Sequence, residues 1–268
     1  MIELTLLDHL PLWAFFLASL GIALATGECG YRLGRHRKGK SGAEKEEAVG
    51  SVVGATLGLL AFLLAFTFGL AASRYDTRRE ALQEEVNAIG TTYLRASFLP
   101  DLYGSKVRAL LREYVDVRLE ANKPGASLAE AISKSEKIQN ELWKHAAAVG
   151  RDLDKPGAPN SDMMALFVDS LNQTINAHAK RLGAVSRARV PAAMWAGLFI
   201  IAIIAIVSMG YDVGIMGTPR PIVGLGMILC FAVTMWLIAD LDRAFEGFIR
   251  VNYQGMIDLR ASMNDETP

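Results

Sequence analysis

Cysteine is scarce in this sequence, and neither sign of charge prevails. The chain of 268 residues has two cysteines, Cys29 and Cys230, and both lie outside the charged middle of the sequence. No disulfide framework can therefore hold that middle region together. Lysine and arginine number 28, as do aspartate and glutamate, so the formal net charge is zero. Because nothing global favours a strongly charged partner, we expect no nucleic acid to bind.

Motifs for catalysis and for cofactors are also missing. The sequence has no nucleophile elbow, no phosphate-binding loop and no glycine-rich dinucleotide turn. Its four histidines lack metal-ligand spacing. One of them, His178, falls on an apolar seam, which favours a core histidine over a ligand. We therefore expect no enzyme activity, no cofactor and no metal.

Long uncharged runs dominate the sequence instead. Residues 48–73 contain no charged side chain, and about 20 helical residues suffice to cross the apolar core of a bilayer. Three other runs meet the same criterion, at residues 9–27, 190–211 and 221–239. The chain is therefore predicted to be an integral membrane protein with four transmembrane helices.

The region between the second and third runs is charged throughout and has the size of one small domain. Glycine and proline gather only where four periodic apolar stretches meet, which favours helices. We predict an all-α fold, with a helical bundle inserted between the second and third spans. The first bundle helix continues the second span without a break, and the last leads into the third span through a kink at Pro191.

The predicted division of the chain has four parts. They are 1–73 for the first two spans with a basic loop at 31–47, 74–190 for the bundle, 191–240 for the last two spans, and 241–268 for an amphipathic tail. The side of the membrane on which the bundle lies stays open. The basic first loop favours a bundle outside the cytoplasm, whereas basic residues at the membrane ends of the bundle favour the opposite side.

One face of the second span consists of small residues at three- and four-residue steps. They are Gly50, Gly54, Gly58, Ala61, Ala65 and Gly69. Small residues let helix backbones approach closely in lipid, so we expect this face to pack against another helix. A second row lies beside it and consists of Phe62, Phe66 and Leu70. Around a symmetry axis this row could line a narrow pore; the alternative is that it faces lipid or the core of its own chain.

Charged residues gather where the second and the last span end. They are Arg74, Asp76 and Arg78 after the second span, and Asp240, Asp242 and Glu246 at the end of the fourth. Carboxylates at this depth either pair with a cation or line an aqueous route. The two interpretations are a charged pore mouth and a structural belt of ion pairs.

Five stretches, at residues 54–62, 66–68, 74–79, 85–95 and 240–247, together resemble the bestrophin-like family of bacterial and plant membrane proteins. The resemblance implies distant kinship with bestrophins, which are pentameric anion channels with four spans per subunit. In those channels an apolar row on the second span forms the neck, and Phe62, Phe66 and Leu70 match its spacing. The acidic string that binds calcium in animal bestrophins is absent, so calcium gating is not expected.

Our leading hypothesis is a homo-oligomeric ion channel or pore, a pentamer by resemblance, in a bacterial inner (plasma) membrane. Its second span would line the pore, and its partners would be membrane lipid, inorganic ions and further copies of the chain. The alternative is a membrane-anchored signalling or scaffold protein whose helical domain binds a ligand or partner.

Overall fold

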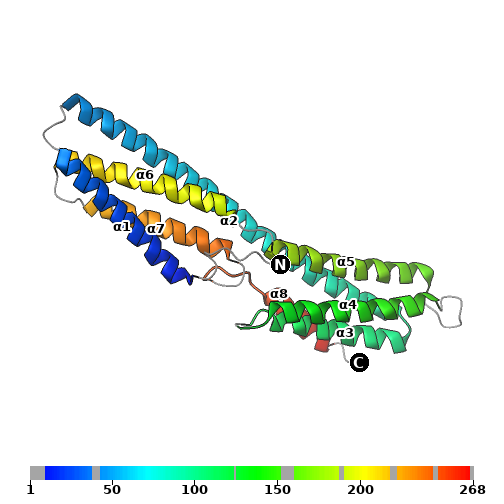
Figure 1. Cartoon of the computed structure of the whole chain (residues 1–268). Coiled ribbons are helices and arrows are strands. Elements are labelled where there is room, and N and C mark those ends of the chain that lie inside the picture. Colours follow the sequence, from blue (N-terminus) through cyan, green and yellow to red (C-terminus); the bar gives the residue numbers. More distant parts are fainter. Residues whose placement is uncertain are drawn as a thin grey trace. The chain divides into compact units, whose positions relative to one another are not determined.

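The computed structural model describes residues 10–37, 43–123, 125–151, 160–186, 190–217, 222–243 and 247–265. Its elements (Figure 1) are α1 (Leu12–Arg37), α2 (Ala43–Arg95), a 3₁₀ turn η2 (Ala96–Phe98), α3 (Asp101–Glu120), α4 (Leu128–Arg151), α5 (Ser161–Ser186), α6 (Ala192–Met216), α7 (Ile222–Asp242) and α8 (Gln254–Asp265). No strand occurs in these residues, and the predicted all-α fold is confirmed.

Four helices are long and apolar enough to cross a membrane, which confirms the four predicted spans. They are α1, α2 through Val49–Phe98, α6, and α7 from Gly224 to Asp242. Within α2, only the uncharged stretch 48–73 suits the apolar layer. The charged side chains from Arg74 onward place the rest of the helix outside that layer.

The chain divides into two compact units. The membrane unit comprises Met1–Tyr75 and Arg187–Arg250, and the bundle unit comprises Asp76–Ser186 and Val251–Pro268. Helix α2 contributes to both of them, since the division falls between Tyr75 and Asp76.

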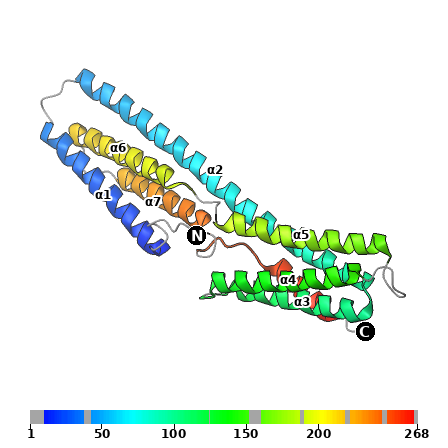
Figure 2. The same cartoon turned by 45° about the vertical axis from the view of Figure 1, so that its right-hand side comes forward.

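In the membrane unit, α1, α6 and α7 lie side by side (Figure 2). The backbones of α1 and α6 touch because glycines face each other across the contact. A Cβ atom built on Gly30 would collide with the carbonyl oxygen of Val207, and one on Gly214 would collide with that of Tyr31. The fold therefore requires glycine at these positions, as is common where membrane helices pack closely.

Helix α2 joins the membrane unit through a single face. The side chains buried on that face are Val53, Leu60, Leu64, Thr67 and Ala71. Leu60, Leu64 and Ala71 belong to the same apolar core as Phe15 of α1 and Trp195 of α6, whose rings meet edge to face with centroids 5.5 Å apart.

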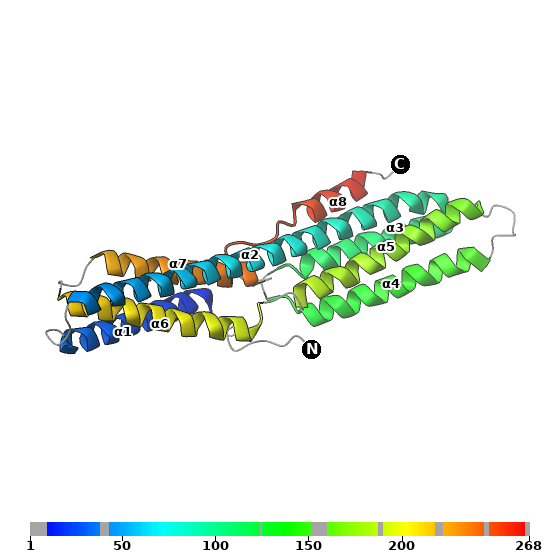
Figure 3. The ribbon, with the colours of Figure 1, turned by 90° about the horizontal axis from the view of Figure 1, so that it is seen from above.

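In the bundle unit, α3, α4 and α5 pack with the second half of α2, and α8 lies alongside α3 (Figure 3). The core includes Ile89, Leu111 and Leu171, each fully buried, and α8 adds Met256 and Met263. The amphipathic tail predicted at 241–268 thus contains a helix that begins at Gln254 and packs on the bundle.

The prediction of a kink at Pro191 is wrong. Helix α5 ends at Ser186 and α6 begins at Ala192. Pro191 stands just before α6 with an extended ψ of 142°. Because proline lacks an N–H group and is disfavoured inside a helix, it starts a new helix here rather than bending an existing one.

Candidate functional site

The predicted pore row lies on the open side of α2 in the membrane unit. Phe62 is 66% exposed and Phe66 is 60% exposed, while Leu70 is half-buried. The two phenylalanines are therefore not core residues of their own chain. Their side chains are left to face lipid or another copy.

The stripe of small residues beside this row is equally open. Gly54, Gly58, Ala61, Ala65 and Gly69 are exposed, and Gly50 is half-buried. A Cβ atom built on any of these four glycines meets no described atom within 4 Å. In contrast to the glycines between α1 and α6, nothing among the described residues of the chain requires glycine on this face of α2.

The charged residues that follow on α2 differ in burial. Arg74 is half-buried and Asp76 is exposed, whereas Arg78 is buried. Four residues of an α-helix turn through about 400°, so a row at four-residue steps drifts around the helix. The row of Phe66 and Leu70 therefore leaves the open side by the time it reaches Arg78.

Asp240 is fully buried at the end of α7. Its two carboxylate oxygens accept hydrogen bonds from the backbone N–H groups of Phe248 at 2.8 Å and Ile249 at 2.9 Å. Gly247 has a positive φ of 116°, and a Cβ atom there would collide with the carboxylate of Asp240, so this position requires glycine. Asp240 therefore fixes the turn that follows α7.

Asp242, the last residue of α7, and Arg243, which follows it, each bind another segment of the chain. Asp242 Oδ1 accepts a hydrogen bond at 2.8 Å from the N–H group of Val190, just before α6. Arg243 donates to the carbonyl oxygen of Leu10, just before α1. This geometry favours structural roles for the acidic residues over an open mouth. Glu246, the remaining predicted mouth residue, lies outside the described residues.

The bundle unit contains a buried ionic cluster that the sequence analysis missed. Glu85 is 0% exposed on the bundle half of α2. It forms ion pairs with Arg118 of α3, at 3.2 Å, and with Arg181 of α5. Tyr114 donates its hydroxyl proton to Oε1 of Glu85 at 2.8 Å. Two guanidinium groups thus share one carboxylate, and these three groups together carry a net positive charge.

The hydroxyl group of Tyr114 also fixes the tautomer of His178. Its one proton goes to the carboxylate, which can only accept. Nδ1 of His178, at 2.9 Å from the hydroxyl oxygen, must therefore be the donor in that contact. His178 is buried, as the core interpretation of this histidine predicts. Among the described residues no group of His, Cys, Asp and Glu side chains could hold a metal ion.

The cluster keeps Glu85 ionised and Tyr114 neutral. Burial alone would raise the pKa of Glu85, but the imidazole of His178 and the charges of Arg181 and Arg118 outweigh burial and hold the pKa far below its usual range. Burial and the charge of Glu85 raise the pKa of Tyr114 well above its ordinary value. The carboxylate is therefore a fixed negative charge inside the bundle.

A sequence signal for this cluster existed. Glu85 lies three residues after Leu82 and four before Ile89, which places it on the apolar face of its helix. Arg118 lies four residues after the apolar-face residue Tyr114. Charged residues at core positions must be paired, because an isolated buried charge is prohibitively costly. A charged residue on an apolar helix face therefore predicts a buried ion pair, and Glu85 and Arg118 both meet this criterion.

Four membrane spans, a helical bundle and a second span left open by its own chain define a class of integral membrane protein. The bestrophin-like domain is recognised over residues 15–256. The chain belongs to the bestrophin-like family.

Solved structures share this fold at low sequence identity. A bacterial bestrophin homologue from Klebsiella pneumoniae is similar over 95% of this chain and 98% of that one, with a TM-score of 0.64 and 12% identity. A singly substituted variant of it has a TM-score of 0.62 at 12% identity and the same two coverages. A membrane protein variant has a TM-score of 0.64 at 12% identity, over 95% of this chain and 97% of its own. No curated protein matches the chain.

Proposed function

We propose that this chain forms a homo-oligomeric ion channel or pore of bestrophin-like type in a bacterial inner membrane, with α2 lining the conduction path. The observation that carries the proposal is the open side of α2, where an aromatic row and a glycine stripe are left uncovered. Family membership supports it, because the resemblance implies oligomeric channels whose neck lies on the second span.

The two rows on α2 have complementary roles in this proposal. The stripe of small residues lets the α2 helices of neighbouring copies approach closely, which turns the aromatic row toward their common axis. Phe62 and Phe66, repeated once per copy, form stacked apolar rings that control ion passage by excluding water. Arg74 and Asp76 supply charge where this path leaves the apolar layer. Asp240 and Asp242 keep their structural roles.

Planar-bilayer recording of the purified protein tests the proposal. We expect ion conductance from the wild type and a larger conductance from Phe66→Ala, because the substitution widens an apolar ring. Phe68→Ala is the matched control, since Phe68 is also exposed on α2, at 40%, but lies off the row. Silence of the wild type and of Phe66→Ala would overturn the proposal, as would an equal effect of the two substitutions.

The number of subunits separates the channel from its alternative. Native mass spectrometry of the detergent-solubilised protein should show four or more subunits, five by resemblance, as a ring around a pore requires. A dimer would instead favour a membrane-anchored signalling or scaffold protein, in which two α2 helices pack through their small residues without enclosing a path.

A further inference from the structure

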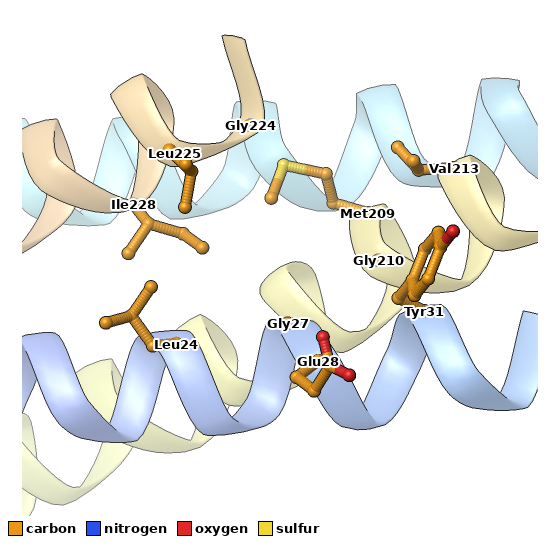
Figure 4. A pocket seen from close by; sticks show the side chains of 10 residues that line it. All are labelled: Leu24, Gly27, Glu28, Tyr31, Met209, Gly210, Val213, Gly224, Leu225 and Ile228. Carbon is orange, nitrogen blue, oxygen red and sulfur yellow. The ribbon is translucent and has the colours of Figure 1, made fainter. Parts of the chain in front are cut away.

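A groove of about 370 Å³ lies between α1, α6 and α7 of the membrane unit (Figure 4). This volume is typical of a small-molecule site. Side chains of the three helices line the groove, and all of them are apolar except Glu28 and Tyr31. No residue of α2 belongs to the lining, so the groove is separate from the proposed pore row.

Glycines explain why the groove exists. The backbones of α1 and α6 touch at one side of it, since a Cβ atom on Gly210 would collide with the carbonyl oxygen of Gly27. A Cβ atom on Gly27 would also crowd Ile228 of α7, at 3.3 Å. With no side chain at these positions, the space between α1 and α7 stays open.

The groove runs from the apolar layer to the membrane interface. Leu24 of α1 and Ile228 of α7 point toward one another at one end, and Tyr31 stands at the other (Figure 4). The uncharged run of α1 ends at Gly27. Leu24 therefore lies at the level of lipid chains, whereas Glu28 and Tyr31 lie at the level of head groups, where tyrosine is enriched.

Charges of both signs lie at the interface end of the groove, one in the lining and one beside it. Glu28 lines the groove and accepts a hydrogen bond at 2.8 Å from Nε of Arg32, one turn further along α1. The Arg32 side chain is 77% exposed, so most of its guanidinium donors point to the surroundings. Along α1 a carboxylate in the groove is thus followed, one turn beyond the lining, by an exposed guanidinium group.

We propose that the groove binds a phospholipid whose head group carries a primary ammonium, as phosphatidylethanolamine does. One acyl chain lies against Leu24 and Ile228, the ammonium donates to Glu28, and the phosphate meets Arg32. A choline head group has no N–H to donate to the carboxylate, and a glycerol head group brings no positive charge to it. Membrane lipid surrounds these spans, so no other source of the ligand is needed. The proposal does not depend on ion conduction.

Head-group selectivity is tested by native mass spectrometry of the full-length protein. The delipidated protein is offered equal amounts of ethanolamine, choline and glycerol phospholipids with identical acyl chains. We expect the wild type to retain the ethanolamine lipid about fivefold better than the others, the size expected for one interfacial charge contact. Glu28→Gln should retain all three equally. Equal retention by the wild type, or undiminished selectivity in Glu28→Gln, would overturn the proposal.

The position of the acyl chain is tested by filling the groove. Leu225→Trp places a large ring in the lining and should abolish retention. Leu229→Trp is the control, because Leu229 is 49% exposed on the same helix but does not line the groove, and it should retain lipid as the wild type does. An ethanolamine lipid with a photoreactive acyl chain should label the wild type near Leu24 or Ile228. Labelling confined to other faces of the spans would contradict the assignment, whether or not Leu225→Trp folds.

Discussion

The two halves of helix α2 meet their surroundings differently. In the bundle unit its apolar side chains, such as Leu82 and Ile89, are buried by the same chain, and even the charged Glu85 receives partners from α3 and α5. In the membrane unit only one face is buried, and Phe62 and Phe66 remain open. One chain therefore covers most of the apolar side chains of the bundle half, with Leu94 as an exception at 61% exposed, and leaves a whole side of the membrane half open.

The difference follows from the solvent of each half. In water an apolar face must be covered because its exposure is unfavourable. In lipid an uncovered apolar face costs little, since the acyl chains are as apolar as leucine, and close packing depends on small residues. The exposed phenylalanines are therefore compatible with a stable single chain. The unused glycine stripe is the feature that calls for a partner helix.

Breaking the ionic cluster should have the largest effect on the bundle half. Glu85→Gln leaves two buried guanidinium groups without their carboxylate, which should cost about 3–5 kcal/mol of unfolding free energy. Urea unfolding in detergent, followed by circular dichroism, measures it. Glu84→Gln is the matched control: its carboxylate is half exposed and pairs with Lys180, so its loss should cost at most about 1 kcal/mol. Similar losses in the two variants would contradict the burial argument.

The same carboxylate should make the bundle sensitive to acid. The pKa of Glu85 is lower in the folded state than in the unfolded state, so its contribution is present above the unfolded pKa, about 4.3. As the pH falls below that value the unfolded state binds the proton first, and the contribution declines. The protection of the bundle half of α2 against hydrogen exchange, measured relative to the unfolded chain at the same pH, should therefore fall below about pH 4. This acid-dependent part should be missing in Glu85→Gln, and its persistence there would assign it to other groups.

Much of the fold follows from the sequence, and the acidic residues at the end of α7 show why the rest does not. The uncharged runs predict the spans because few side chains tolerate the apolar layer. Helix periodicity predicts the bundle. The partners of Asp240 and Asp242 are different: they are backbone N–H groups of Phe248 and Val190. Val190 is 52 residues away along the chain, so only the tertiary fold brings it to Asp242.

For the stripe of small residues on α2, the sequence predicts the kind of contact but not the helix that makes it. The spacing of Gly54, Gly58 and Gly69 predicts close helix packing but says nothing of which helix arrives. In the structure Gly30 of α1 lies against the backbone of α6 and Gly214 of α6 lies against that of α1, whereas the glycines of the α2 stripe meet nothing described. The same residue type at the same spacing thus serves contacts within the chain in one place and leaves a free face in the other.

A substitution to alanine should affect stability differently at the glycines between α1 and α6 and at those of the α2 stripe. Gly30→Ala forces a Cβ atom into the carbonyl oxygen of Val207, so α1 and α6 must move apart, at a cost of about 1–3 kcal/mol. Thermal unfolding in detergent should show a clear fall in midpoint. A midpoint equal to that of the wild type would mean that the two helices are not held at this contact.

The smallest effect should come from Gly54→Ala, and its direction decides what covers α2. Alanine favours a helix over glycine by up to about 1 kcal/mol, and a Cβ atom at Gly54 meets nothing described in its own chain. The single chain should therefore keep or slightly raise its unfolding midpoint, in contrast to Gly30→Ala. If neighbouring copies pack on the stripe, the same methyl group holds their backbones apart. The oligomer seen by native mass spectrometry should then dissociate at a higher protein concentration than the wild type does. Gly197→Ala is the control. A Cβ atom at Gly197 also meets nothing described, but Gly197 belongs to α6, so this substitution should leave the stability of the oligomer unchanged. If Gly54→Ala weakens the oligomer no more than Gly197→Ala does, lipid covers the stripe. The two halves of α2 would then differ only in whether protein or lipid surrounds them.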